Sequence, residues 1–214
     1  METSSLLVDL PAGSGPGGSP RFVRRIRSQS HARWHRDSHP IQRAGELTAQ
    51  VGHASEPARV LCGLNHALCG KFTDNFVTAV YVYVDLEKNL MRYAGAGHPP
   101  VLQWRSSTGK TTQVLENGLV LGMLEEAVYT ALELTLEPGD RHILYTDGIL
   151  EAANPAQEMY GVDRFIEFMN VNKSLPADQF ADTFLAEITN WTRQSADHGQ
   201  QDDITLLLFD FKRP

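Results

Sequence analysis

The sequence has few cysteines and no long apolar run. Its two cysteines, Cys62 and Cys69, are too few for a disulfide-rich secreted scaffold. The segment around them is predicted to be helical, which puts the thiols roughly 10 Å apart and beyond disulfide reach. The longest apolar run, residues 76–84, is too short to span a bilayer. Because no basic stretch followed by an apolar core opens the sequence, we expect a cytoplasmic protein without membrane contact.

Positive charge is scarce over most of the chain. Lys and Arg number 19 against 26 Asp and Glu, a net charge of −7, which does not suit a dedicated nucleic-acid binder. Residues 1–50 hold seven Arg, no Lys and four acids, whereas the remainder holds 12 basic and 22 acidic residues. Together with the Gly-, Pro- and Ser-rich residues 11–20, this break predicts a low-order segment over 1–50 and one domain over 51–214.

Hydrophobic periodicity after residue 51 predicts hairpins followed by helices. A helix is expected from residue 55 to 69, where Gly70 ends it. Two amphipathic helices are expected on the apolar faces formed by Val162, Phe165, Ile166 and Met169 and by Phe180, Phe184, Ile188 and Trp191. Strands are expected at 76–85, 90–94, 101–104, 111–115, 128–136, 142–145 and 204–211. This order of elements predicts an α+β fold with helices layered on sheets.

Several short patterns are weak candidates for ligand sites. Residues 13–18 match G-x-G-x-x-G, but no amphipathic helix follows them, so they predict a flexible linker. The sequence has no G-x-S-x-G pattern, which argues against a serine hydrolase of that type. Histidines 31, 35 and 39 share a helical spacing, but Pro40 opposes a helix there. Cys62, His66 and Cys69 also share a helical face, which is more typical of packing than of metal binding.

Two acidic motifs stand next to predicted strands. Asp147 follows the strand at 142–145, and Asp202 and Asp203 come directly before the last strand. Carboxylates at strand ends can converge at one edge of a sheet, and hard divalent cations prefer such oxygen ligands. The chemistry alone leaves open that all three are ordinary turn residues, because Asp is common in turns.

Eight short motifs follow one another along the chain. They are Leu64-Asn65-x-x-Leu68, Phe76-Val77-Thr78-Ala79, Tyr93-Ala94-Gly95-Ala96-Gly97-His98-Pro99-Pro100, Gly118-x-x-Leu121-Gly122, Pro138-Gly139-Asp140, Tyr145-Thr146-Asp147-Gly148-Ile149-Leu150-Glu151-Ala152, Tyr160-Gly161 and Asp202-Asp203-Ile204-Thr205. Their order resembles the PPM-type (protein phosphatase 2C-like) serine phosphatase domain of the SpoIIE/RsbU kind. The resemblance runs from about residue 55 to 212 and implies an αββα sandwich of two antiparallel sheets flanked by helices, incomplete at the N-terminus.

The resemblance also implies an activity. Members of this family remove phosphate from serine or threonine of a phosphorylated regulatory protein, such as an anti-sigma-factor antagonist, and use two Mn²⁺ or Mg²⁺ ions. By motif match, Asp147 and Asp202 are expected to be the catalytic carboxylates and metal ligands. Asp203 is expected to lie beside them, with a water-mediated metal contact. His98 matches a stretch with a structural role.

The sequence departs from the family on its N-terminal side. Family motifs of the type Gly-Asp-x-x-Asp and Asp-Val-Ser-Gly-His-Gly do not occur, and Asp9 is only a faint counterpart of the second. The chain resembles a domain that lacks its N-terminal third, so one weak metal site or none is expected. The alternative is a catalytically inactive remnant or pseudophosphatase that serves at most as a protein-binding domain.

Overall fold

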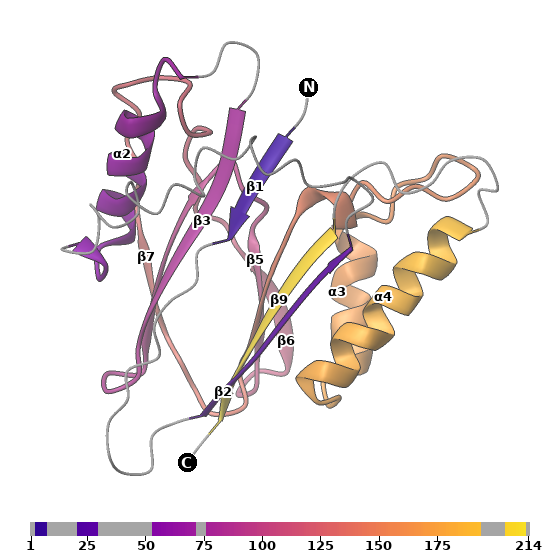
Figure 1. The fold of residues 1–214 in the computed structure, drawn as a ribbon. Coiled ribbons are helices and arrows are strands. Elements are labelled where there is room, and N and C mark those ends of the chain that lie inside the picture. Colours follow the sequence, from indigo (N-terminus) through magenta and orange to yellow (C-terminus); the bar gives the residue numbers. More distant parts are fainter. Residues whose placement is uncertain (1–2, 8–20, 30–52, 72–75, 194–203, 213–214) are drawn as a thin grey trace. The chain divides into compact units, whose positions relative to one another are not determined.

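A computed structural model describes residues 3–7, 21–29, 53–71, 76–193 and 204–212 (Figure 1). The chain divides into two compact units, and the expected α+β class is confirmed. The helices are α2 (Pro57–Leu68), the 3-10 helix η3 (Asp147–Ile149), α3 (Gly161–Asn172) and α4 (Ala177–Arg193). The strands are β1 (Thr3–Leu7), β2 (Arg21–Gln29), β3 (Phe76–Asp85), β4 (Leu90–Ala96), β5 (Val101–Arg105), β6 (Lys110–Val114), β7 (Leu132–Thr135), β8 (Arg141–Tyr145) and β9 (Ile204–Lys212).

The first unit contains one four-stranded sheet in the order β1-β3-β4-β7. β3, β4 and β7 are antiparallel, whereas β1 pairs parallel with β3, so this sheet is mixed at that edge. The apolar face of α2 packs on the sheet: Leu61, Leu64 and Leu68 are fully buried in one cluster with Ala94 and Leu121. Burial of this face stabilises the helix, as its periodicity predicts.

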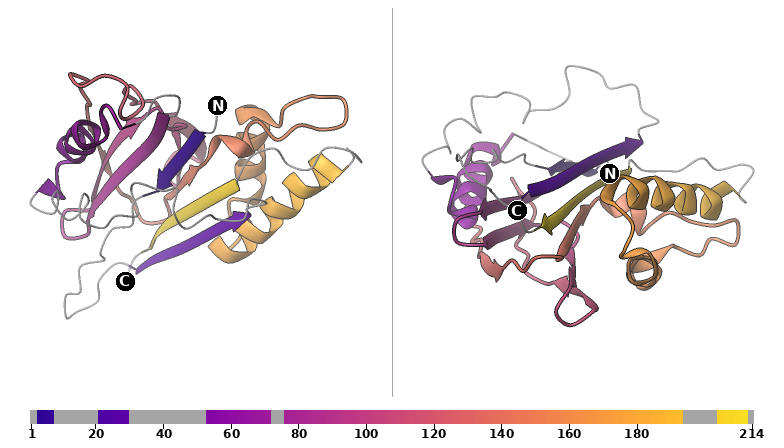
Figure 2. Two further views of the ribbon diagram at one scale, coloured as in Figure 1. Left: turned by 45° about the horizontal axis from the view of Figure 1, so that its top comes forward. Right: turned by 90° about the horizontal axis from the view of Figure 1, so that it is seen from below.

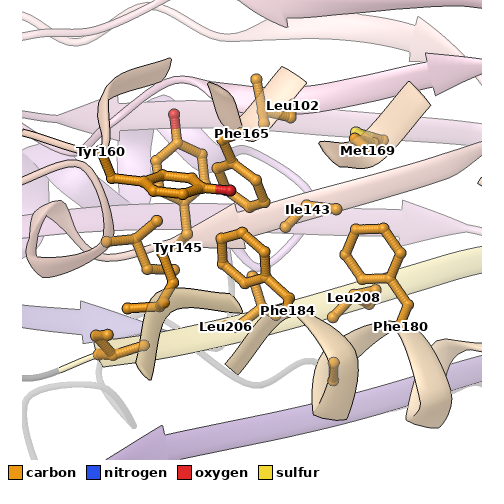
Figure 3. Close-up of a cluster of buried hydrophobic side chains, with 14 of the residues drawn as sticks. Leu102, Ile143, Tyr145, Tyr160, Phe165, Met169, Phe180, Phe184, Leu206 and Leu208 are labelled. Carbon is orange, nitrogen blue, oxygen red and sulfur yellow. The ribbon is translucent and has the colours of Figure 1, made fainter. Parts of the chain in front are cut away.

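The second unit contains a five-stranded antiparallel sheet in the order β2-β9-β8-β5-β6. Figure 2 shows β2 lying beside β9, with which it pairs along all nine residues. α3 and α4 pack on this sheet through an aromatic cluster (Figure 3). Phe165 stacks on Phe184 with 4.3 Å between ring centroids and meets Tyr145 edge-on at 5.0 Å. These contacts join both helices to β8.

A buried ion pair fixes the pairing of β8 with β9. Arg141 and Asp210 lie opposite each other in the ladder. The Arg141 Nε donates to Asp210 Oδ1 at 2.6 Å and its Nη2 donates to Oδ2 at 2.8 Å. Nη2 also donates to the carbonyl of Leu175, in the connection between α3 and α4, at 2.7 Å. The pair therefore connects two strands and the helical layer within this unit.

Most predicted elements are confirmed, with differences of a few residues at their ends. The strand predicted at 128–136 is shorter, because only Leu132–Thr135 of it pairs with β4. Two segments inside residues 1–50 are strands, β1 and β2, which differs from the low order expected across that range. The domain boundary at residue 51 stays a prediction. In the described residues, no helix has the length and apolar character that crossing a membrane requires.

Two of the histidines that the structure describes are buried, one in each unit. His98 and His142 are each 1% exposed. Burial lowers the pKa of His98 to about 4, although its Nδ1–H donates to the Pro99 carbonyl at 2.9 Å. Burial likewise lowers the pKa of His142 to about 4, against the opposing effect of Asp140. The Nε2 atoms of both rings have no hydrogen-bond partner among the described residues. Both rings are therefore neutral at pH 7.

Replacing Arg141 by Met is expected to lower the free energy of unfolding by about 3–5 kcal/mol, because it leaves the Asp210 carboxylate buried without its partner. Arg59→Met is the matched control, since the Arg59–Glu56 pair is exposed and worth at most about 1 kcal/mol. Urea unfolding measures both. The double variant Arg141→Met/Asp210→Leu should recover most of the lost free energy of unfolding. Equal losses for Arg141→Met and Arg59→Met would contradict a stabilising role of the buried pair.

The buried histidines predict a loss of stability in acid. Their folded-state pKa lies below the unfolded value of about 6.5, so between about pH 6.5 and 4 only the unfolded state binds these protons. Each histidine then contributes a decrease of about 1.4 kcal/mol per pH unit as the pH falls. Urea unfolding between pH 7.5 and 4.5 should give a shallower slope for His142→Gln than for the parent.

Candidate functional site

Asp147 lies just beyond the carboxyl end of β8, where the chain turns into η3. β8 is buried along all five residues, whereas Asp147 is half-buried. The Asp147 Oδ1 accepts a hydrogen bond from the Gly148 N–H at 3.1 Å, and its carbonyl accepts one from Glu151 at 3.0 Å. These bonds orient the carboxylate at the strand end. The prediction that Asp147 follows a buried strand is confirmed.

A reciprocal pair of threonines joins this strand end to the start of β9. The Thr146 N–H donates to the Thr205 carbonyl at 3.1 Å, and the Thr205 N–H donates to Thr146 Oγ1 at 2.8 Å. The β8–β9 ladder therefore extends beyond Tyr145↔Leu206 to the residue next to Asp147. The sequence pattern alone does not predict this pairing. The signal was a threonine close to an aspartate in both motifs, Thr146-Asp147 and Asp203-Ile204-Thr205.

The segment after Asp147 is held by hydrogen bonds from the start of α3 and from a side chain of α4. The Leu150 carbonyl accepts the Gly161 N–H at 3.0 Å, which fixes the start of α3. The Ala152 carbonyl accepts both the Tyr160 N–H at 2.8 Å and the Trp191 indole N–H at 3.0 Å. The motif residues Tyr160 and Gly161 therefore position the turn that contains Asp147.

The other predicted site residues, Asp202 and Asp203, lie outside the described residues, as do Asp9, the 13–18 linker motif and the histidines at 31, 35 and 39. Within the described ranges, no three His, Cys, Asp or Glu side chains come together as a metal centre would require. Asp147 is thus the one predicted ligand with a described position. The ligand roles of all three aspartates stay predictions.

Motifs of the first unit build a structural loop around β4. The amide of Asn65 on α2 donates to the Leu124 carbonyl at 2.8 Å, and its Oδ1 accepts the Gly122 N–H at 2.9 Å. The Gly97 N–H donates a hydrogen bond to the Gly118 carbonyl at 2.9 Å. Gly97 has φ +65, and a Cβ there would lie 2.3 Å from Val120. A glycine is therefore required for this close approach.

The Pro138-Gly139-Asp140 motif is a turn whose aspartate side chain accepts hydrogen bonds from neighbouring backbone N–H groups. The buried Asp140 carboxylate accepts the Ser106 N–H at 2.8 Å and the Glu137 N–H at 3.1 Å. This arrangement connects the β5–β6 turn to the start of β8. It is a structural role, and it lies at the opposite end of β8 from Asp147.

Two curated relatives have phosphatase names. The chain is 26% identical to phosphoserine phosphatase RsbP of Bacillus subtilis over 168 residues, which cover 76% of this chain and 39% of RsbP. It is 30% identical to phosphoserine phosphatase RsbU of the same organism over 96 residues, which cover 44% of this chain and 29% of RsbU. The chain thus spans about two fifths of the length of RsbP.

Solved structures support the fold. The PP2C domain of SiaA from Pseudomonas aeruginosa matches with a TM-score of 0.67 at 22% identity, covering 91% of this chain and 81% of the SiaA chain. The phosphatase domain of SpoIIE from Bacillus subtilis, in its Mn-presoaked form, matches with a TM-score of 0.51 at 16% identity. That match covers 98% of this chain and 95% of the SpoIIE chain. At these identities the likeness shows a PP2C-type fold.

A family model matches most of the chain. The model of stage II sporulation protein E (SpoIIE) matches residues 41–212, which include α2, the Asp147 turn and β9. The resemblance inferred from eight motifs agrees with this match and with the PP2C-type fold. The chain therefore belongs to the SpoIIE family.

Proposed function

We propose that this chain is a metal-dependent serine/threonine phosphatase domain that acts on a phosphorylated regulatory protein. The observation that supports it most is the Thr146–Thr205 pairing, because it joins the strand end that bears Asp147 to the start of β9. Asp202 precedes Ile204 by two residues, and two residues span at most about 7 Å. Asp202 and Asp203 come directly before this strand in the sequence, so the proposal assigns them to the same site as Asp147.

The carboxylates of the proposed site suit Mn²⁺ or Mg²⁺ as cofactor. Asp147, Asp202 and Asp203 offer carboxylate oxygens, which hard divalent cations prefer. The described part of the site contributes one such oxygen ligand, oriented by the Gly148 N–H. When bound, the ions would supply activation of water and neutralisation of charge on the phosphate oxygens. A Mn-presoaked SpoIIE phosphatase-domain structure and an RsbX structure in complex with magnesium support this class of metal.

The proposed substrate is a phosphoserine or phosphothreonine of a partner protein, such as an anti-sigma-factor antagonist. The names of RsbP and RsbU as phosphoserine phosphatases support this class of substrate. The net charge of −7 opposes a nucleic-acid substrate. The cytoplasmic location expected from the two free thiols, Cys62 and Cys69, stays a prediction.

A catalytically inactive protein-binding domain is the second candidate. The 214 residues contain neither the Gly-Asp-x-x-Asp nor the Asp-Val-Ser-Gly-His-Gly motif of the family. Three carboxylates from one side can hold one hydrated Mg²⁺ or Mn²⁺ weakly, because Mg²⁺ keeps most of its waters. Two closely spaced ions need more anionic ligands than these. Turnover by this chain is therefore expected to be slow.

Asp147→Asn should remove the phosphatase activity. The expected result is slow Mn²⁺-dependent release of phosphate from a phosphoserine peptide by the parent chain, and a further decrease of more than about 100-fold in the variant. Asp182→Asn, an exposed change of the same kind on α4, is the matched control and should keep the parent rate. A malachite-green assay with and without EDTA measures the release.

The outcomes of this assay separate the two candidates. No release by the parent at saturating Mn²⁺ would favour the inactive protein-binding domain. Fast release by the parent that Asp147→Asn abolishes would mean that a further residue, such as Asp9, completes the metal site. An Asp147→Asn variant as active as the parent would contradict the role of Asp147.

Thr146→Val should weaken metal binding because it changes how the start of β9 is held, without removing a predicted metal ligand. The substitution removes the oxygen that accepts the Thr205 N–H and leaves that donor unpaired, at a cost of about 1–3 kcal/mol. The start of β9 is then held less firmly beside Asp147. Mn²⁺ titration followed by electron paramagnetic resonance should show weaker binding for Thr146→Val and near-parent binding for Thr146→Ser. Equal affinities for the Val and Ser variants would contradict this positioning role.

A further inference from the structure

Exposed apolar side chains gather in one connection of the first unit, the 115–131 loop between β6 and β7. Seven large hydrophobic residues are exposed in the described part of the chain, and five of them lie in this loop. Their exposed fractions range from 47% to 78%: Leu115 73%, Leu119 48%, Met123 66%, Leu124 47% and Val128 78%. One connection therefore contributes most of the large apolar side chains that are exposed in the described residues, a distribution that differs from single, scattered exposed residues.

The 115–131 loop is held by the unit beneath it. Asn65, which is 1% exposed, bonds both the Leu124 carbonyl and the Gly122 N–H. The Leu121 N–H donates to the Val77 carbonyl at 2.9 Å. Leu121, Ala127 and Tyr129 are buried in the cluster with α2. The exposed apolar side chains are therefore presented on an ordered backbone, which reduces the entropy lost on binding.

The loop also has charge of one sign. Residues 115–131 contain three acids, Glu116, Glu125 and Glu126, and no Lys, Arg or His. Glu125 and Glu126 are exposed and directly follow Met123 and Leu124. His66 on α2 lies 3.3 Å from Glu125, so the helix surface joins the loop at this point. Apolar contact combined with negative charge defines the chemistry of a matching partner.

We propose that the 115–131 loop is a docking surface for a cationic amphipathic segment of a partner protein. Apolar side chains of that segment cover Met123, Leu124 and their neighbours, while its Lys or Arg residues meet the exposed Glu125 and Glu126. A second copy of the chain fits less well, because two such loops facing each other would bring like charges together. This proposal does not depend on the phosphatase activity, since none of its residues is a predicted metal ligand.

The test uses the whole chain and a fluorescent 18-residue peptide of Leu and Lys in amphipathic helical order, with a Leu/Glu peptide of the same order as its counterpart. Fluorescence anisotropy should show binding of the Leu/Lys peptide that weakens with added salt, and little binding of the Leu/Glu peptide. Met123→Ser/Glu126→Lys should weaken binding more than tenfold. Circular dichroism checks that the variant is folded.

The matched control is Glu167→Lys/Val171→Ser on α3, which makes the same change in charge and exposed apolar surface elsewhere. It should leave the affinity within about twofold of the parent. Equal losses of peptide affinity in both double variants would mean that net charge alone determines binding, and would overturn the proposal. It would also be overturned by equal binding of the Leu/Glu peptide. A dimer in sedimentation that only the loop variant loses would assign the surface to a second copy. Tighter loop-dependent binding of a peptide of residues 30–50 would assign it to this chain.

Discussion

The pairing of β8 with β9 is the interaction on which the second unit depends. At one end of the ladder Arg141 and Asp210 form a buried bidentate pair, and at the other end Thr146 and Thr205 exchange two hydrogen bonds. A shift of one residue would turn the buried side chains of β8 to the opposite face and separate both pairs. The register is therefore specified at both ends, and with it the position of Asp147.

The same ladder organises the helical layer. Arg141 donates to the Leu175 carbonyl and lies 5.0 Å from the ring centroid of Phe180, so the connection between α3 and α4 is fixed to the sheet. Tyr145, at the other end of β8, meets Phe165 of α3. Figure 3 shows these rings in one cluster with Ile143, Leu206 and Leu208 of the two strands. Aromatic contacts of this geometry add to the free energy of apolar burial.

The hydrophobic pattern of the sequence predicted the elements that are strongly apolar or that pair with a neighbour close in sequence. β3 has the predicted bounds, and β8 and β9 differ from them by one residue. β2 was missed because its Arg-rich sequence has little alternation and its partner, β9, is almost the whole chain away. The strand end that bears Asp147 could be predicted, whereas the Thr146–Thr205 pairing depends on a register that one sequence does not reveal.

The proposed hydrolysis and the proposed partner binding concern different parts of this chain. The predicted metal ligands adjoin β8 and β9 of the second unit, whereas the 115–131 loop belongs to the first unit and is held by Asn65 and the β4 backbone. Loss of carboxylates at the strand ends removes no contact that supports the loop. The proposed docking surface therefore does not require a complete metal site, so catalysis and partner binding can be tested separately in this protein.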